Sequence, residues 1–213
     1  MLNKIIKSKY LHRLDNIKQW QEMDVFKEES VSQHSYKDAV FARVLLEDVF
    51  GHSIDPKVLL FKLDVVSRAI FHDWDEALIL RDMSHETKYN DYNGEEVRRV
   101  LDNLSKHIAL REFKETDEHG TDTDASNMML SMVCACPEPE KKFAKLCDWM
   151  ALYFYMKRER SLGNRGLDEQ WERAKQNFPK AVDAVINSLK INFPDVEINI
   201  TELYNLKNLF NDE

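Results

Sequence analysis

Four side chains with metal-binding chemistry stand out in the sequence: His34, the adjacent pair His72 and Asp73, and Asp148. Two imidazoles and two carboxylates form a mixed nitrogen and oxygen set that suits a divalent ion such as Mn, Co, Fe, Mg or Zn. Each of the four sits beside an apolar helical run, where an unpaired charge is costly. A single histidine on a helix is more often a hydrogen-bonded core or surface residue, and the intervals alone fix no geometry. The residues by themselves therefore indicate a metal site in a helical domain and no more.

The spacing of apolar residues is helical almost throughout the chain, and glycine and proline number only five each. An all-α fold is therefore predicted. Pro56 suits the first turn of a helix that runs into Phe71, and this helix is apolar on most sides, which predicts a buried position. The polar stretch 82–93 and the acidic stretch 115–124 are predicted loops. The predicted helices cover residues 3–19, from Ser30 or Ser32 to about 50, from 56 into 71–73, and about 94–115, 125–135, 138–160, 167–190 and 201–210.

Length and charge narrow the class of protein. With 213 residues, the chain is long enough for one domain with a sizeable core and short for two. The formal net charge of −8 argues against binding to polymeric nucleic acid, which needs clustered Lys and Arg. A small anionic substrate is compatible with this charge, because one metal ion or two basic side chains can reverse the local field.

Cysteine usage and the first residues give an expectation about location. The three cysteines, Cys134, Cys136 and Cys147, are an odd number, and residues 1–7 lack the apolar region of a secretory signal. No apolar run approaches the roughly 20 residues that span a membrane. We therefore expect a cytoplasmic protein without membrane association. The spacing of Cys134 and Cys136 is a poor zinc motif and favours buried small residues instead.

The order His…His-Asp…Asp on successive helices resembles the HD superfamily of metal-dependent phosphohydrolases. Local sequences are similar to one branch, the YfbR-like bacterial 5′-deoxynucleotidases. Residues 29–35 resemble its Glu-x-Val-(Ser/Ala)-Glu-His-Ser opening, and residues 71–77 contain its His-Asp-x-x-Glu segment. Further similarity lies in Lys18–Trp20, Asp82, Thr87–Tyr89 and Lys145–Asp148. The resemblance covers about residues 10–165 and implies a single HD domain over residues 1–213, with extra C-terminal helices at about 167–210.

The resemblance implies that His34, His72, Asp73 and Asp148 are the ligands of a divalent metal ion. Glu76 lies four residues after His72 and so faces the same side of a helix. In the family this glutamate positions or deprotonates the attacking water, and Asp82 would assist at the leaving group or the water. The alternative for Glu76 is a solvated helix residue.

The resemblance also implies substrate contacts. Trp20 matches the family tryptophan that packs against the sugar and disfavours a ribose 2′-hydroxyl, although an apolar staple between the first helix and the core suits it equally. Lys88 could contact phosphate or be a solvated loop lysine. The family arginine before the tryptophan is Gln19 here, and Arg13 or Lys18 could replace its charge.

Two further positions depart from the family pattern. The glutamate before the first ligand is Gln33. The loop of residues 81–89 lacks the family glycine and both prolines, and His85 takes the place of a small hydroxyl residue. Because this loop should shape substrate choice, the altered residues bear on which nucleotide is accepted.

The function that this resemblance implies is hydrolysis of deoxynucleoside 5′-monophosphates, by attack of a metal-activated water. The alternative is release of triphosphate from a deoxynucleoside triphosphate at the same site. A non-catalytic nucleotide-binding protein and an all-α interaction protein are hypotheses of other classes. The partner expected is a small nucleotide. A homo-oligomer is compatible with the aromatic segment Trp149–Tyr155, which an ordinary core helix explains as well.

Overall fold

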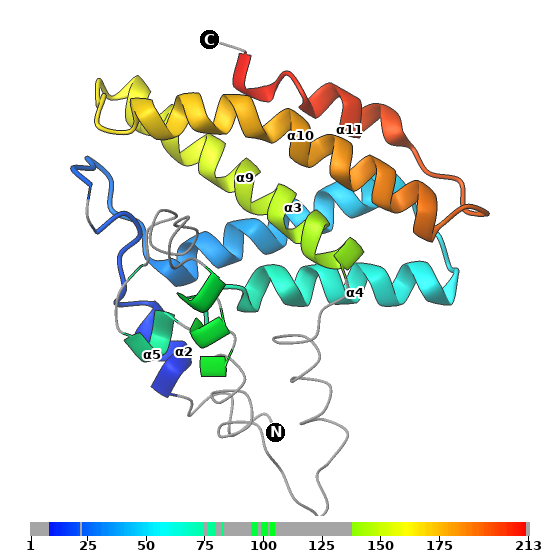
Figure 1. Ribbon diagram of the computed structural model, residues 1–213, viewed down its shortest axis with the longest axis horizontal. Coiled ribbons are helices and arrows are strands. Elements are labelled where there is room, and N and C mark those ends of the chain that lie inside the picture. The colour runs from blue at the N-terminus through cyan, green and yellow to red at the C-terminus, as the bar shows by residue number, and fades with distance from the viewer. Residues whose placement is uncertain are drawn as a thin grey trace, which may run out of the picture. The chain divides into compact units, whose positions relative to one another are not determined.

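The computed structural model describes residues 9–21, 23–74, 76–79, 82, 95–97, 99–101, 103–104 and 138–211. These residues form helices and no strand (Figure 1). One isolated β-bridge joins Lys18 to Ser30. The predicted all-α fold is therefore confirmed for the described chain. Its elements are α2 (Lys9–Leu14), α3 (Val31–Phe50), α4 (Pro56–Phe71), α5 (Glu76–Ile79), α9 (Glu138–Ser161), α10 (Asp168–Asn192), α11 (Ile200–Leu206) and the 3-10 helix η1 (Leu209–Asn211).

The chain divides into two compact units. The first unit comprises Met1–Asp24, Glu28–His34 and Phe71–Cys136, and the second comprises Val25–Lys27, Ser35–Ile70 and Pro137–Glu213. The prediction of a single HD domain stays a prediction. Within the described residues, no helix is long and apolar enough to cross a membrane.

The second unit has an aromatic core. Tyr153, Trp171 and Phe210 lie within 5.0–5.6 Å of one another, centroid to centroid, and draw α9, α10 and η1 together. A second group joins Phe50 of α3, Phe61 of α4 and the nearby rings of Phe143 and Phe193. Burial of such rings, many in edge-on contact, supplies much of the packing energy. α9 and α10 pack side by side, and α11 and η1 pack on α10 (Figure 1).

A reciprocal cap fixes the start of α3. The hydroxyl of Ser30 accepts a hydrogen bond from the backbone N–H of Gln33 at 3.3 Å, and the Gln33 Oε1 accepts one from the Ser30 N–H at 3.0 Å. This is a capping box, in which glutamine serves as well as glutamate. Of the two predicted caps, Ser30 and Ser32, the structure uses Ser30. The glutamine that departs from the family pattern therefore keeps a structural role.

A buried lysine holds the other end of α3. The Lys62 side chain is 5% exposed and donates to the Gly51 carbonyl at 2.6 Å and to Glu47 Oε2 at 3.1 Å. Gly51 has a φ of 56°, the left-handed conformation that ends many helices. The ammonium thus satisfies a carbonyl at the negative end of the helix while it pairs with a carboxylate.

The predicted helix boundaries hold best in the C-terminal half. The predictions of 138–160 and 167–190 correspond to α9 and α10, and 201–210 corresponds to α11 and η1. In the described part of the first predicted helix, only Lys9–Leu14 is helical, because the chain turns at Asp15 and Lys18 then pairs with Ser30. Of the predicted helix at 94–115, residues 95–97, 99–101 and 103–104 are described and helical. The predicted helix at 125–135, and the predicted loops apart from Asp82, lie outside the described residues.

One expectation about burial is wrong. The α4 helix was expected to be buried on most sides, but Leu59, Leu60 and Leu63 are 50%, 62% and 52% exposed. The opposite side, with Val58, Phe61, Val65 and Ala69, is buried. Apolar residues around a helix predict burial only if other elements cover every side.

We expect Lys62→Met to lower the free energy of unfolding by about 1–3 kcal/mol, because the Gly51 carbonyl and Glu47 lose their charged donor. The hydrogen bond from Lys62 lowers the pKa of Glu47 below its ordinary value. A lowered folded-state pKa contributes stability above the unfolded pKa of about 4.3, and this stability is lost as pH falls through the folded pKa. Thermal unfolding should therefore separate the variant from the native chain more at pH 7 than at pH 3. An equal difference at both values would contradict the assignment.

Candidate metal centre

Two histidines predicted to bind metal lie together in the first unit. Their ring centroids are 5.7 Å apart, with the planes inclined at 58°. His34 lies in the first turn of α3, which the capping box positions, and His72 directly follows the end of α4. Two imidazoles at this separation can offer nitrogen donors to one ion, the pattern that the sequence predicted.

Asp73 contacts the ring of its neighbour. The His72 Nε2 and the Asp73 Oδ2 are 2.9 Å apart, and the Asp73 side chain is only 11% exposed. This separation is that of a direct contact between the two side chains, an ion pair if His72 is protonated. Imidazole nitrogen and carboxylate oxygen are also donor types that a divalent ion would bind.

A buried glutamate lies beside His34. The Glu29 Oε1 lies 3.7 Å from the His34 Nδ1, which is close enough for electrostatic attraction and too long for a hydrogen bond. Glu29 is 4% exposed. Its carboxylate adds a negative charge next to the candidate metal donors.

Asp38 is a candidate ligand that the sequence analysis missed. It lies one turn after His34 on α3, so the two side chains share one face of the helix, and it is 0% exposed. A buried carboxylate needs a compensating positive charge. The signal was present in the sequence as an acidic residue four positions after a histidine, next to the apolar run that begins at Ala39.

Asp148 lies on α9, as predicted, and its Oδ2 is bound by the ammonium of Lys145. A carboxylate has two oxygens and can contact two cations at once, so this ion pair is compatible with a role as a metal ligand. Burial raises the pKa of the Cys147 thiol, and the charges of Asp38 and Asp148 raise it further. Both carboxylates therefore lie near this thiol, which stays protonated and is a poor metal ligand.

Among the described residues, His34, Asp38, His72 and Asp148 form a group of side chains that could hold a metal ion. Three of the four predicted ligands belong to this group, and Asp38 joins them. The prediction of Asp73 as a ligand stays a prediction. The donors are two imidazoles and two carboxylates. This mixed set suits Mn, Fe, Co or Zn better than it suits Ca, which prefers oxygen ligands alone.

Both predicted catalytic residues, Glu76 and Asp82, lie among the described residues. Glu76 begins α5, is 1% exposed, and its backbone N–H donates to the Asp73 carbonyl at 3.1 Å. It is therefore not the solvated helix residue considered as an alternative. Asp82 accepts a hydrogen bond from the backbone N–H of Trp20 at 2.5 Å. Trp20 has a φ of 62°, a left-handed conformation that is rare for a bulky residue.

The predicted substrate-binding cations differ in their surroundings. Arg13 donates to the Ala77 carbonyl at 3.4 Å, so it lies beside α5. Lys18 pairs with Glu28 at 3.2 Å, with both side chains well exposed. Lys88 lies outside the described residues. The roles of Arg13, Lys18 and Lys88 in phosphate binding therefore stay predictions.

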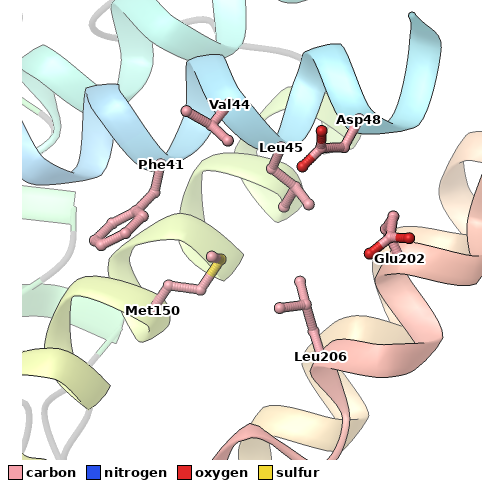
Figure 2. A pocket seen from close by; sticks show the side chains of 7 residues that line it. All are labelled: Phe41, Val44, Leu45, Asp48, Met150, Glu202 and Leu206. Atoms are coloured by element: carbon pink, nitrogen blue, oxygen red, sulfur yellow. The ribbon is translucent and has the colours of Figure 1, made fainter.

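A shallow pocket in the second unit has a different character (Figure 2). Apolar side chains line most of it, with Asp48 and Glu202 at its rim, and none of its lining residues is basic. Two carboxylates repel a phosphate, so this pocket does not suit a nucleotide. Its lining residues are Phe41, Val44, Leu45, Asp48, Met150, Glu202 and Leu206.

The chain matches one protein family and is similar in fold to solved structures. A family model described as 5′-deoxynucleotidase YfbR-like matches residues 8–196. No curated protein sequence matches the chain. An HD-domain phosphohydrolase from Listeria innocua is 17% identical, with a TM-score of 0.59, over 98% of this chain and 92% of that one. A protein from Pyrococcus horikoshii OT3 is 18% identical, with a TM-score of 0.60, over 98% and 99% of the two chains. At these identities the two structures show the fold alone.

We expect Asp38→Asn to weaken binding of Mn²⁺ or Co²⁺ by at least about tenfold, because the site loses a negative charge that holds the cation. Asp48→Asn is a matched control, since it makes the same substitution on the same helix, at the rim of the pocket in Figure 2. Isothermal titration of the metal-stripped proteins with each ion measures the affinity. Equal affinities for both variants would remove Asp38 from the ligand set.

Proposed function

Because the chain belongs to the YfbR-like family of 5′-deoxynucleotidases, we propose that it uses a divalent metal ion to hydrolyse the 5′-phosphate of deoxynucleoside monophosphates. The observation that carries this proposal is the family match over residues 8–196, which spans every candidate site residue. The family makes the chain a phosphohydrolase, and the deoxynucleoside monophosphate is the substrate that we propose. The products would be a deoxynucleoside and inorganic phosphate.

We assign the metal to His34, Asp38, His72 and Asp148, with Asp73 as a further ligand beside His72. The fit rests on the donor chemistry and on the complete burial of Asp38. When bound, the ion would polarise a phosphoryl oxygen and make water easier to deprotonate. The carboxylate of Glu29, 3.7 Å from the His34 Nδ1, adds negative charge that would favour a bound cation.

Glu76 is the base that we assign to the attacking water. Its side chain is almost fully buried, and its backbone is tied to Asp73. A carboxylate held four residues after His72 can accept a proton from water that attacks the phosphorus in line with the leaving oxygen. The proton lost by the water would be held on Glu76 and then delivered, directly or through solvent, to the leaving 5′-oxygen, which gives the deoxynucleoside and returns Glu76 to its starting state.

Trp20 is the residue that we assign to recognition of the sugar. Its left-handed backbone is sparsely populated for a large side chain, and the hydrogen bond to Asp82 helps to maintain it. Strain of this kind occurs more often at binding sites than elsewhere. Asp82 would then act by holding Trp20, in addition to any contact with the leaving group. Arg13 and Lys88 are the proposed phosphate contacts, with Lys18 as the weaker candidate because Glu28 pairs with it.

We expect the purified chain to release phosphate from deoxynucleoside monophosphates when Mn²⁺, Co²⁺ or Mg²⁺ is added. A panel of deoxy- and ribonucleotides, each as mono- and triphosphate, with separate detection of phosphate and triphosphate, measures the choice. Preferred release of triphosphate from deoxynucleoside triphosphates would replace the proposed substrate and keep the phosphohydrolase. Failure to release either product, with any metal, would contradict both.

Glu76→Gln should lower kcat by about 10²- to 10⁴-fold, because an amide cannot accept the proton of the attacking water. The change retains the size of the side chain, so metal affinity should stay near the native value. Glu172→Gln, on the exposed surface of α10, is the matched control and should leave kcat unchanged. A Glu76→Gln enzyme with native kcat would exclude this residue as the base.

Trp20→Ala should reduce the preference for deoxyribose over ribose. An apolar wall discriminates against an added hydroxyl by up to about a hundredfold, and removal of the indole should abolish most of this preference. The ratio of kcat/KM for matched deoxy- and ribonucleoside monophosphates measures it. An unchanged ratio would support the alternative role of Trp20 as an apolar staple.

A further inference from the structure

A second buried carboxylate, outside the candidate metal donors, holds a loop. The Glu159 side chain near the end of α9 is 0% exposed. Its oxygens accept hydrogen bonds from the backbone N–H groups of Phe26 at 2.6 Å and Lys27 at 2.9 Å, and from the Asn164 side chain at 2.8 Å. Burial raises the pKa of Glu159, but the hydrogen bonds from Phe26, Asn164 and Lys27 outweigh it and lower the pKa. The carboxylate is therefore charged, and its hydrogen bonds are of the stronger, charge-assisted kind.

The same helix holds the other side of Lys27. The Lys27 carbonyl accepts hydrogen bonds from the Tyr155 hydroxyl at 3.0 Å and from the Arg158 guanidinium at 3.4 Å. Both backbone groups of Lys27 are thus satisfied by α9, whereas its side chain is exposed. A loop backbone bonded on both sides to a rigid helix has little freedom to move.

These contacts fix the middle of the connection between α2 and α3. The base of this connection is closed by hydrogen bonds from the Gln19 N–H to the Glu29 carbonyl at 2.7 Å and from the Val31 N–H to the Ile17 carbonyl at 2.9 Å. Trp20 follows directly after this closure, with its left-handed backbone. A loop that is closed at its base and anchored at its middle can hold one unfavourable conformation at Trp20, because the anchors oppose its relaxation.

We propose that Glu159 is a positioning residue for substrate selection: by binding Phe26 and Lys27, it keeps Trp20 in the conformation that receives the deoxyribose. This inference rests on the proposed function. It adds that sugar selectivity depends on a carboxylate that itself touches neither metal nor substrate. Fixed geometry matters here because a misplacement of about 1 Å can cost a hundredfold in rate.

The test is Glu159→Gln, which keeps the shape of the side chain. It replaces one acceptor oxygen with an NH2 group, which is a donor and cannot accept the N–H groups that the carboxylate binds. Two readouts are compared with the native chain. Trypsin should cut after Lys27 faster in the variant, because the backbone there can open. For deoxynucleoside monophosphates, kcat/KM should fall by roughly tenfold to a hundredfold, mainly through KM, and the preference for deoxyribose over ribose should shrink.

Lys62→Met is the matched control, because it also removes a buried charged group of the second unit, one that bonds to Glu47 and Gly51 and not to the loop. It should lower the melting temperature without faster cleavage at Lys27 and without a change in sugar preference. If Glu159→Gln does not fold, Tyr155→Phe removes one hydrogen bond to the Lys27 carbonyl and should shift both readouts in the same direction, by less.

The outcomes separate the two proposals. A native chain that hydrolyses no nucleotide defeats the proposed function. A native chain that is active and selective, with a Glu159→Gln variant of unchanged sugar preference, overturns the positioning role. The positioning role is also overturned if Lys62→Met loses sugar preference as much as Glu159→Gln does, since general destabilisation then explains both.

Discussion

The candidate site depends on where α3 begins. His34 lies in the first turn of α3, so it shares a face with Asp38, four residues later, only if the helix has already begun at His34. The capping box between Ser30 and Gln33 stabilises this first turn, because it supplies partners for backbone N–H groups that have none inside the helix. The hydrogen bond from the Val31 N–H to the Ile17 carbonyl then fixes the preceding chain. A local capping interaction thereby stabilises the helical turn that places His34 on the same face as Asp38.

The second constraint is charge in the interior. Among the described residues, the buried carboxylates are Glu29, Asp38, Asp73, Glu76 and Glu159, and Lys62 is the buried lysine. Lys62 is matched by Glu47 and Gly51, and Glu159 by three N–H donors. The other four carboxylates belong to the stretches around His34 and His72. Several buried carboxylates destabilise a folded protein unless protons or a cation neutralise their charge. A divalent ion that neutralises them is therefore bound tightly.

Two kinds of feature could be predicted from the sequence: helices, from the periodicity of apolar residues, and the family, from short motifs. Helices with a buried face, such as α3, α9 and α10, follow from the apolar spacing, and the family was identified from strings that surround His34 and His72. Asp38 was missed because a carboxylate four residues after a histidine is common in ordinary helices and gains meaning only when it is found to be buried. Gln33 looked like a loss relative to the family pattern, yet its amide makes the cap that a glutamate would make.

The role of Glu159 could not be predicted from the sequence for a different reason. Its partners at Phe26 and Lys27 are backbone N–H groups more than 130 residues away in the chain, and backbone groups have no signature in a sequence.

Three polar side chains of α9 lie on one face of the helix, and their spacing is visible in the sequence although their partners are not. Asp148 and Glu159 are eleven residues apart, about three helical turns, so both lie on one face of the helix. Tyr155 lies seven residues after Asp148 on the same face and reaches the Lys27 carbonyl. One helix thus carries a candidate metal ligand, Asp148, and the side chains that bind the backbone of Phe26 and Lys27, so both depend on the same rigid element of the second unit.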